Sequence, residues 1–190
     1  SRSAQARKLS LISLDRMGFK LSIDQVIPLL DTKDPALKRA AMEIAGRHPD
    51  WAKNISSLID TWLKTEKPGQ DERAMLRGAV KAFNANPEVR SVVAAHLEDE
   101  AGSAEKLSAL LEAVARCGSA GLPAEWKKGF REVLDRDNEA LRSQAVATLR
   151  ILGETGFRER LLKLANTAET PQRLKISALA AVTIDRGKLD

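Results

Sequence analysis

The segment DNEALRSQAVATLRILG (residues 137–153) carries the pattern that decides the fold of this chain. Its apolar residues recur every three to four positions, which is the spacing of one face of an amphipathic helix. The segment contains three alanines, whereas a helix that covers a core alone would carry leucines. So thin an apolar face indicates close packing on more than one side, and it predicts similar helices elsewhere in the chain.

Five further segments repeat this pattern of an apolar residue followed, four and eight positions later, by apolar or small residues. In four of the six segments, a basic residue directly follows the first apolar position. The first apolar positions are separated by 31, 38, 32, 34 and 33 residues, a period that is typical of a stacked array rather than of a closed globule. These positions are Ala6, Leu37, Met75, Leu107, Leu141 and Leu174.

A second set of helices is expected between these segments, so that each repeat is a hairpin of a first-type helix and a second-type helix. The first-type helices are predicted at 23–30, 51–63, 88–97, 124–134 and 157–165. Asp-Pro, Asn-Pro and Thr-Pro pairs begin at residues 34, 86 and 170, where the first residue caps a helix and proline occupies its first position. The sequence therefore predicts about eleven short helices in strict alternation.

The composition also favours an all-α chain with an ordinary soluble balance of residues. Of the 190 residues, 43% are hydrophobic, 30% are charged and only 4% are aromatic, and the helix formers alanine, leucine, lysine, arginine and glutamate dominate. A single cysteine, Cys117, excludes an intrachain disulfide and a Cys-x-x-Cys-His haem site, and it is predicted to be a small buried side chain. No uncharged run is long enough to span a membrane.

The repeated pattern, best seen in DPALKRAAMEIAG (34–46) and in residues 137–153, resembles the second helix of HEAT and armadillo repeats. This resemblance implies an all-α, right-handed α-α superhelix (a HEAT/ARM-like solenoid) of about five to six hairpins over residues 1–190, forming a single domain. It also implies that the second-type helices line the concave surface. Both ends lack an obvious polar capping repeat, so we expect a fragment of a longer chain.

The charge is unevenly distributed between the two types of helix. The net charge is +5, but the second-type segments hold 16 lysines and arginines against nine acidic residues, a net of +7, and the rest of the chain has a net of −2. The concave surface is thus expected to be basic and to attract an acidic partner. The candidate partner-binding residues on this surface are Lys8, Arg39, Arg77, Lys81 and Arg150.

A purely structural interpretation competes with this one. The basic residues that directly follow the first apolar positions are expected to pair with carboxylates or helix C-terminal carbonyls of the next repeat, as an internal ladder. They are Arg7, Lys38, Arg142 and Lys175.

No motif for chemistry is present in the sequence, and we predict no catalytic, cofactor-binding or metal-binding residue. His48 and His96 lie in different repeats, and the glycine-containing segments 117–121 and 152–157 are predicted to end helices rather than to bind phosphate. The acidic run LEDEAG (97–102) lacks the oxygen spacing of a calcium loop and is expected to be a solvated helix end. The tryptophans fall on first-type helices, away from the predicted groove.

The sequence therefore favours a non-catalytic helical-repeat scaffold that presents a basic concave surface to an acidic protein. One alternative is a nucleic-acid-binding protein, which would include an alkyl-base DNA glycosylase of the kind found among HEAT-like proteins. Another is a connecting module of a larger dehydrogenase-like, haem-carrying protein. Binding to duplex DNA or RNA at low salt would separate the second class from the first.

Overall fold

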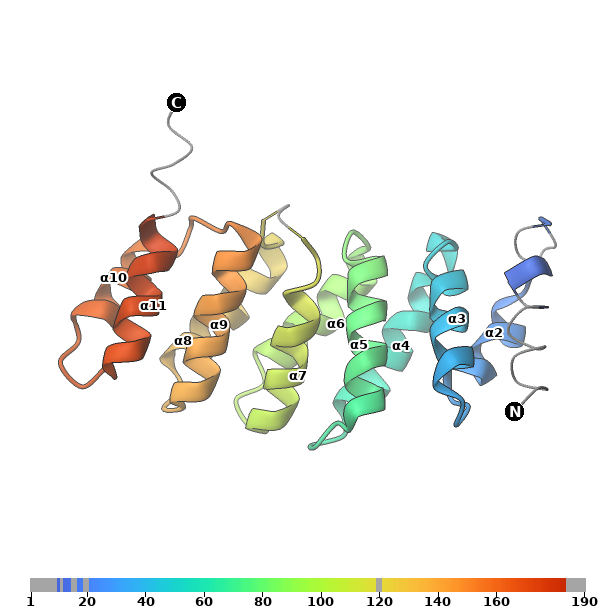
Figure 1. Ribbon diagram of the computed structural model, residues 1–190, viewed down its shortest axis with the longest axis horizontal. Coiled ribbons are helices and arrows are strands. Elements are labelled where there is room, and N and C mark those ends of the chain that lie inside the picture. The colour runs from blue at the N-terminus through green and yellow to red at the C-terminus, as the bar shows by residue number, and fades with distance from the viewer. Residues whose placement is uncertain (1–9, 11, 15–16, 19–20, 119–120, 184–190) are drawn as a thin grey trace, which may run out of the picture.

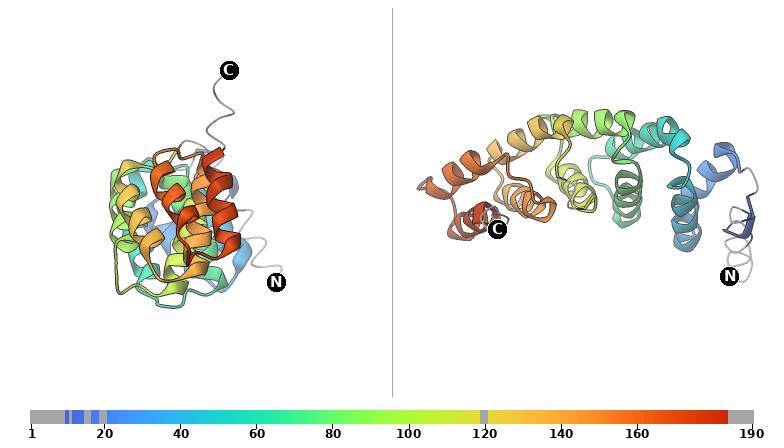
Figure 2. Two further views of the ribbon diagram at one scale, coloured as in Figure 1. Left: turned by 90° about the vertical axis from the view of Figure 1, so that its left-hand side faces the viewer. Right: turned by 90° about the horizontal axis from the view of Figure 1, so that it is seen from above.

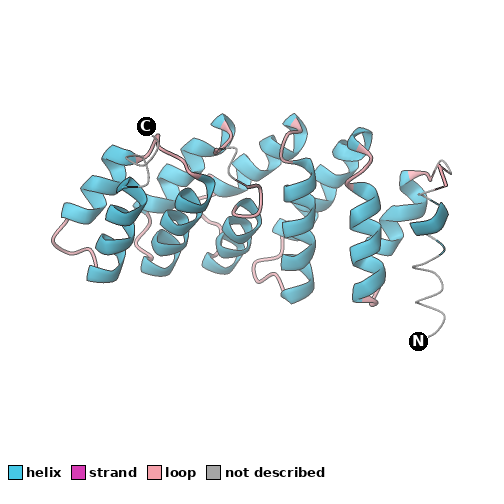
Figure 3. Cartoon of the chain, turned by 45° about the horizontal axis from the view of Figure 1, so that its top comes forward, coloured by secondary structure: helices cyan, strands magenta, loops and turns pink. Residues whose placement is uncertain are grey.

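The computed structural model describes residue 10 and residues 12–14, 17–18, 21–118 and 121–183, and this part of the chain contains helices and no strand (Figure 3). Two 3-10 turns, η1 (Pro49–Trp51) and η2 (Ala124–Trp126), precede α-helices. The α-helices are α2 (Ile23–Leu30), α3 (Pro35–Ala45), α4 (Ala52–Leu63), α5 (Gln70–Phe83), α6 (Pro87–Leu97), α7 (Ala104–Val114), α8 (Lys127–Asp135), α9 (Glu139–Leu152), α10 (Arg158–Asn166) and α11 (Gln172–Thr183).

The helices form two layers along one axis. The second-type helices α3, α5, α7, α9 and α11 each contact the next in the series, and α4, α6 and α8 do the same in the other layer. Figure 1 shows the second-type helices in front of the first-type helices. Seen from above in Figure 2, the array bows, and the second-type helices lie on the inner side of the arc. This arrangement is compatible with a helical repeat fold.

The alanines that stand four positions after four of the six first apolar residues lie between neighbouring helices. Ala41, Ala79, Ala145 and Ala178 all have no exposed surface. Their small side chains let second-type helices pack on both sides at once, and this packing buries apolar area that no single hairpin could bury. The thin apolar face of residues 137–153 is thereby explained, because α9 contacts α7, α8 and α11.

Most of the expected helix starts are observed. The Asp34 side chain accepts hydrogen bonds from the backbone N–H groups of Ala36 (2.8 Å) and Leu37 (3.1 Å), and Asn86 accepts one from Glu88 (3.0 Å). Three starts differ from the prediction. The segments that begin at 51 and 124 contain the end or the whole of a 3-10 turn before the α-helix, and α11 begins at Gln172, one residue after the proline.

The tryptophans pack in or against the core. Trp126 is fully buried, and its indole N–H donates a hydrogen bond to the carbonyl oxygen of Arg90 in the preceding repeat (3.0 Å). Trp51 is 6% exposed and its ring stacks on His48, with 4.1 Å between the centroids. Trp62 is partly buried against the same core.

The first-type helices α6 and α8 pack closely at Gly129 in α8. A Cβ atom at this position would overlap the Cβ of Leu97 in α6 and lie 3.2 Å from the Leu97 carbonyl carbon. Glycine is therefore required here for close packing rather than for an unusual backbone conformation. In the second helix of the same hairpin, Gly153 ends α9 in the left-handed conformation (φ 64°), which confirms that a glycine of the 152–157 segment terminates a helix.

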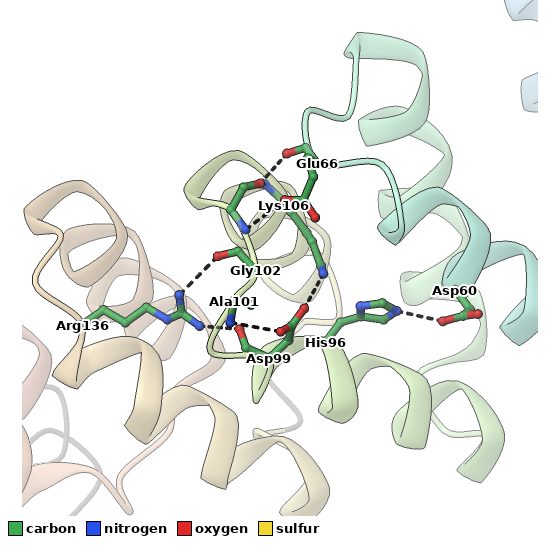
Figure 4. A network of polar contacts seen from close by, with 9 residues as sticks. Asp60, Glu66, His96, Asp99, Ala101, Gly102, Lys106 and Arg136 are labelled. Carbon is green, nitrogen blue, oxygen red and sulfur yellow. Dashed lines mark hydrogen bonds and ion pairs between the residues drawn. The ribbon is translucent and has the colours of Figure 1, made fainter.

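The acidic segment 97–102 follows the end of α6 and is partly exposed, as expected, but it also joins a network of polar contacts between repeats that was not predicted (Figure 4). Asp99 accepts a hydrogen bond from the ammonium group of Lys106 (2.7 Å), and Lys106 is only 3% exposed. The Arg136 guanidinium donates to the carbonyl oxygens of Asp99 and Gly102. Since Arg136 lies after α8 and Asp99 after α6, the network joins the loops of consecutive repeats along one edge of the array.

Two carboxylates of this edge have pKa values that reflect their partners. The hydrogen bond from Lys106 lowers the pKa of Asp99 below its usual value. The pKa of Asp60 is lowered first by its hydrogen bond with Lys64 and then by the one with His96, which lies 2.9 Å away on α6. Both carboxylates are therefore held in the charged form by cations or donors of the fold itself.

Candidate partner-binding surface

The exposed side chains of α3, α5, α7, α9 and α11 on the inner side of the arc are called the inner surface here. Successive exposed positions on one helix lie three or four residues apart, so Arg39 and Glu43 occupy the same side of α3. On α5, the same spacing places Lys81 three residues after Gly78. Because α3 and α5 are adjacent, these side chains face one shared groove.

A pocket of about 420 Å³ lies in this groove between α3 and α5. Its volume is within the range of about 300–1,000 Å³ that is typical of ligand sites. The charged side chains that line it are Arg39, Glu43, Arg47 and Lys81, and the small or apolar residues are Met42, Gly46, Ala74, Met75, Gly78 and Ala82.

The pocket exists because small residues face one another across the two helices. A Cβ atom on Gly78 would lie 2.8 Å from Cγ of Met42, and one on Gly46 would lie 3.1 Å from Cβ of Ala82. Larger side chains at these positions would fill the groove or push the helices apart. The floor is therefore low and apolar, with Met42 and Met75 only 6% and 5% exposed.

Two of the predicted binding residues lie together at this pocket. Arg39 and Lys81 are both exposed and line it from opposite helices. The Arg39 Nε donates to the carbonyl oxygen of Pro35 in its own helix (3.2 Å), which leaves the rest of the guanidinium available. Within the described residues, the Lys81 ammonium has no hydrogen bond or ion pair. Together with Arg47, they give the pocket three cations against the single carboxylate of Glu43.

The other predicted residues are not part of this pocket. Arg77 forms an ion pair with Glu112 on α7 (3.1 Å), and Arg73 forms a second ion pair with the same carboxylate (2.9 Å). The charge of Arg77 is therefore paired between repeats. Arg150 is exposed near the end of α9, where the neighbouring Ile151 is 54% exposed. Lys8 lies outside the described residues.

The predicted internal ladder is observed at one position. Lys38 pairs with Asp71 on the second-type helix of the next repeat (3.5 Å). Lys175 instead donates to the carbonyl oxygen of Ala168 in the loop that precedes its own helix (3.3 Å). Arg142 lies 4.0 Å from Asp137, too far for a hydrogen bond, and Arg7 lies outside the described residues.

The apolar floor was missed by the sequence analysis, which considered only the cations. Met42 and Gly46 lie three and seven positions after Arg39, so a helical spacing search could have placed them beside it. The pairing of Gly78 with Met42 could not be found in this way, because it depends on the distance between two helices.

Two observations on the described part of the chain concern metal binding and cysteine reactivity. Within it, no three or more histidine, cysteine, aspartate or glutamate side chains gather closely enough to hold a metal ion. Cys117 is partly buried, and burial raises the pKa of its thiol to about 11, so the nucleophilic thiolate is scarce at neutral pH. Among the described helices, none is both long and apolar enough to cross a bilayer.

Comparison with known proteins gives no match. No family model matches the chain, and no curated protein or solved structure matches it either. The inner surface must therefore be interpreted from its own geometry.

Proposed function

We propose that this chain is a non-catalytic protein-interaction module, whose inner surface binds an acidic segment of a partner protein. The observation that carries the proposal is the pocket between α3 and α5, which combines an apolar floor with Arg39 and Lys81 at its rim. An apolar side chain of the partner would enter the pocket, and flanking carboxylates would pair with the rim. Apolar anchors in pockets commonly dominate binding energy, while rim charges contribute selectivity and association rate.

A HEAT/armadillo-like, right-handed superhelix is the architecture that we infer for the whole array. The strict alternation of helices and the placement of second-type helices on the inner side of the arc support it. Such arrays present long curved surfaces to extended partners. On this basis, the pocket is an anchoring point in a longer groove rather than an isolated site.

A peptide titration tests the proposal. The probe is a fluorescein-labelled peptide with one leucine flanked by glutamates, and its fluorescence anisotropy is followed at low and at moderate salt. The double variant Arg39→Gln/Lys81→Gln should weaken binding about tenfold, since two partly exposed charge pairs together contribute about 1.4 kcal/mol. The control variant Lys33→Gln/Lys53→Gln removes the same charge at exposed positions away from the pocket and should change affinity little.

Three further outcomes decide between the possibilities. Replacing the leucine of the peptide by glycine should weaken binding as well, because the apolar floor loses its contact. Equal losses in the pocket variant and in the control variant would contradict the proposal. Tighter binding of a duplex DNA than of the peptide at low salt, where phosphate contacts are strongest, would favour the nucleic-acid alternative instead.

That alternative has less support from the residues of the inner surface. Phe83 is the only aromatic residue of the described second-type helices and is 3% exposed, so these helices present no exposed aromatic side chain on which a base could stack. Glu43 and Glu112 also place carboxylates among the cations. We therefore favour a protein partner, whose mixed apolar and acidic character matches both parts of the pocket.

A further inference from the structure

A second cavity of about 190 Å³ lies at the loop edge of the array, away from the α3–α5 pocket. Its lining comes from the end of α8, the first turn of α9, one side of α10 and the loop between α10 and α11, toward the lower edge in Figure 1. The volume is below the range of about 300–1,000 Å³ of typical small-molecule sites. This cavity is therefore large enough for a polar group but small for a complete metabolite.

The charged residues of this cavity are strongly unbalanced. Arg142, Arg160 and Lys163 line it with three positive charges, and Asp135 contributes the single negative charge. Arg160 forms an ion pair with Asp135 (2.9 Å), which uses only part of the five-donor guanidinium. The lining thus carries a net charge of +2, which matches a doubly charged oxyanion.

Arg142 supplies an independent observation. Its Nε atom is buried and has no hydrogen-bond partner, and its terminal nitrogen stays 4.0 Å from the nearest carboxylate oxygen, on Asp137. The fold therefore leaves this guanidinium partly unsatisfied, and its terminal nitrogens, rather than the buried Nε, are the donors that a ligand in the cavity would meet. An arginine fork can hold two oxygens of one phosphate at the same time.

A threonine completes the donor set. Thr170 is 5% exposed and lines the cavity, and within the described residues no hydrogen bond is made by its hydroxyl group. A hydroxyl group can donate to an oxyanion. Lys163 is exposed on α10 and can follow the ligand as a mobile point charge.

We propose that Arg142, Arg160, Lys163 and Thr170 form a binding site for a phosphate group, either free phosphate or the phosphate of a monoester. The site is separate from the inner surface, and its existence does not depend on the proposed function. Arg142 provides donors from α9 and Thr170 from the loop before α11, and Arg160 and Lys163 contribute two cations from α10.

Titration of the ¹⁵N-labelled protein with inorganic phosphate at constant ionic strength, adjusted with chloride, tests this proposal. Saturable amide shifts should gather at the α8–α9 loop and at the start of α11. The variants Arg160→Gln and Lys163→Gln should each weaken binding by about tenfold, the cost of one charge-assisted hydrogen bond. Arg150→Gln removes the same charge from α9 outside the cavity and should leave the affinity unchanged.

Two further titrations define the ligand. Glycerol phosphate tests whether the site accepts a monoester: affinity equal to that of inorganic phosphate indicates a phosphorylated molecule, and weaker affinity indicates the free ion. Acetate, with one charge, should bind at least about tenfold more weakly than phosphate. Scattered shifts, equal binding of acetate, or an equal loss in Arg150→Gln would overturn the assignment, since each result would describe nonspecific attraction of anions.

Discussion

Replacement of Gly129 by alanine tests how closely consecutive repeats are packed. Gly129 is buried within α8, and an added Cβ would overlap the Cβ of Leu97 and come within 3.2 Å of its carbonyl carbon and 3.3 Å of its Cα. Backbone atoms cannot rotate away as a flexible side chain can. The two helices α6 and α8 would therefore have to move apart, with loss of contacts on either side of the substitution.

The size of the effect follows from two opposing contributions. Alanine favours a helix over glycine by about 1 kcal/mol. Overpacking a close contact costs about 1–3 kcal/mol, and we expect the upper end because the neighbour is backbone. The free energy of unfolding should thus fall by about 2 kcal/mol. For a chain of this length, this corresponds to a decrease of about 4–8 °C in the unfolding midpoint.

Gly78→Ala is the matched control. It is the same substitution in a second helix, α5, but its Cβ would meet the flexible Met42 side chain at 2.8 Å beside an open pocket. Because Met42 can change its rotamer, the variant should stay within about 1 kcal/mol of the native chain. Thermal and urea unfolding followed by circular dichroism would measure both variants. A Gly129→Ala protein as stable as Gly78→Ala would refute the close packing of α6 against α8.

Three more tests use single substitutions elsewhere in the array. Ala145→Leu should lower the free energy of unfolding by about 1–3 kcal/mol, since Ala145 has no exposed surface; unchanged urea unfolding would show that the helix register is wrong. Asp99→Asn should lower the free energy of unfolding more than Lys106→Met in the same assay, because only Asp99→Asn leaves a buried ammonium group without its counter-charge. The opposite order would contradict the polar network around Asp99. Burial alone would raise the pKa of Glu154, but hydrogen bonds from the N–H groups of Gly156 and Leu122 and from Lys127 lower it. The ionised Glu154 side chain therefore stabilises the fold above its unfolded pKa of about 4.3. This stabilisation is lost as the pH falls through the lower pKa of the folded state. The stability difference between the native chain and Glu154→Gln should accordingly shrink on acidification, and a constant difference would exclude this linkage.

The helices were predictable because the apolar period is carried locally. The segment 23–30 coincides with α2, and the cap at Asp34 with its following proline was visible in the sequence. The 3-10 turns before α4 and α8 were not predicted, because each is a single turn of three residues, which is too short to show a period of its own.

The contacts between repeats were less predictable than the helices. Arg77 looked like a free surface cation, but its partner Glu112 lies 35 positions later and is brought near only by stacking. Similarly, Asp99 was expected to be solvated, and its neighbour Arg136 comes from the next repeat. Charge counting along the sequence cannot separate paired cations such as Arg77 from exposed ones such as Lys81.

The most direct test of the proposed interaction is a map of the surface that the acidic peptide contacts. Amide shifts of the ¹⁵N-labelled protein should change along α3 and α5 when the leucine-containing glutamate peptide is added, with the largest changes around Met42 and Gly78. The outer helix α4 should show no comparable changes. Shifts centred on α4 or α8, or spread evenly over the array, would contradict the assignment of the inner surface as the binding face.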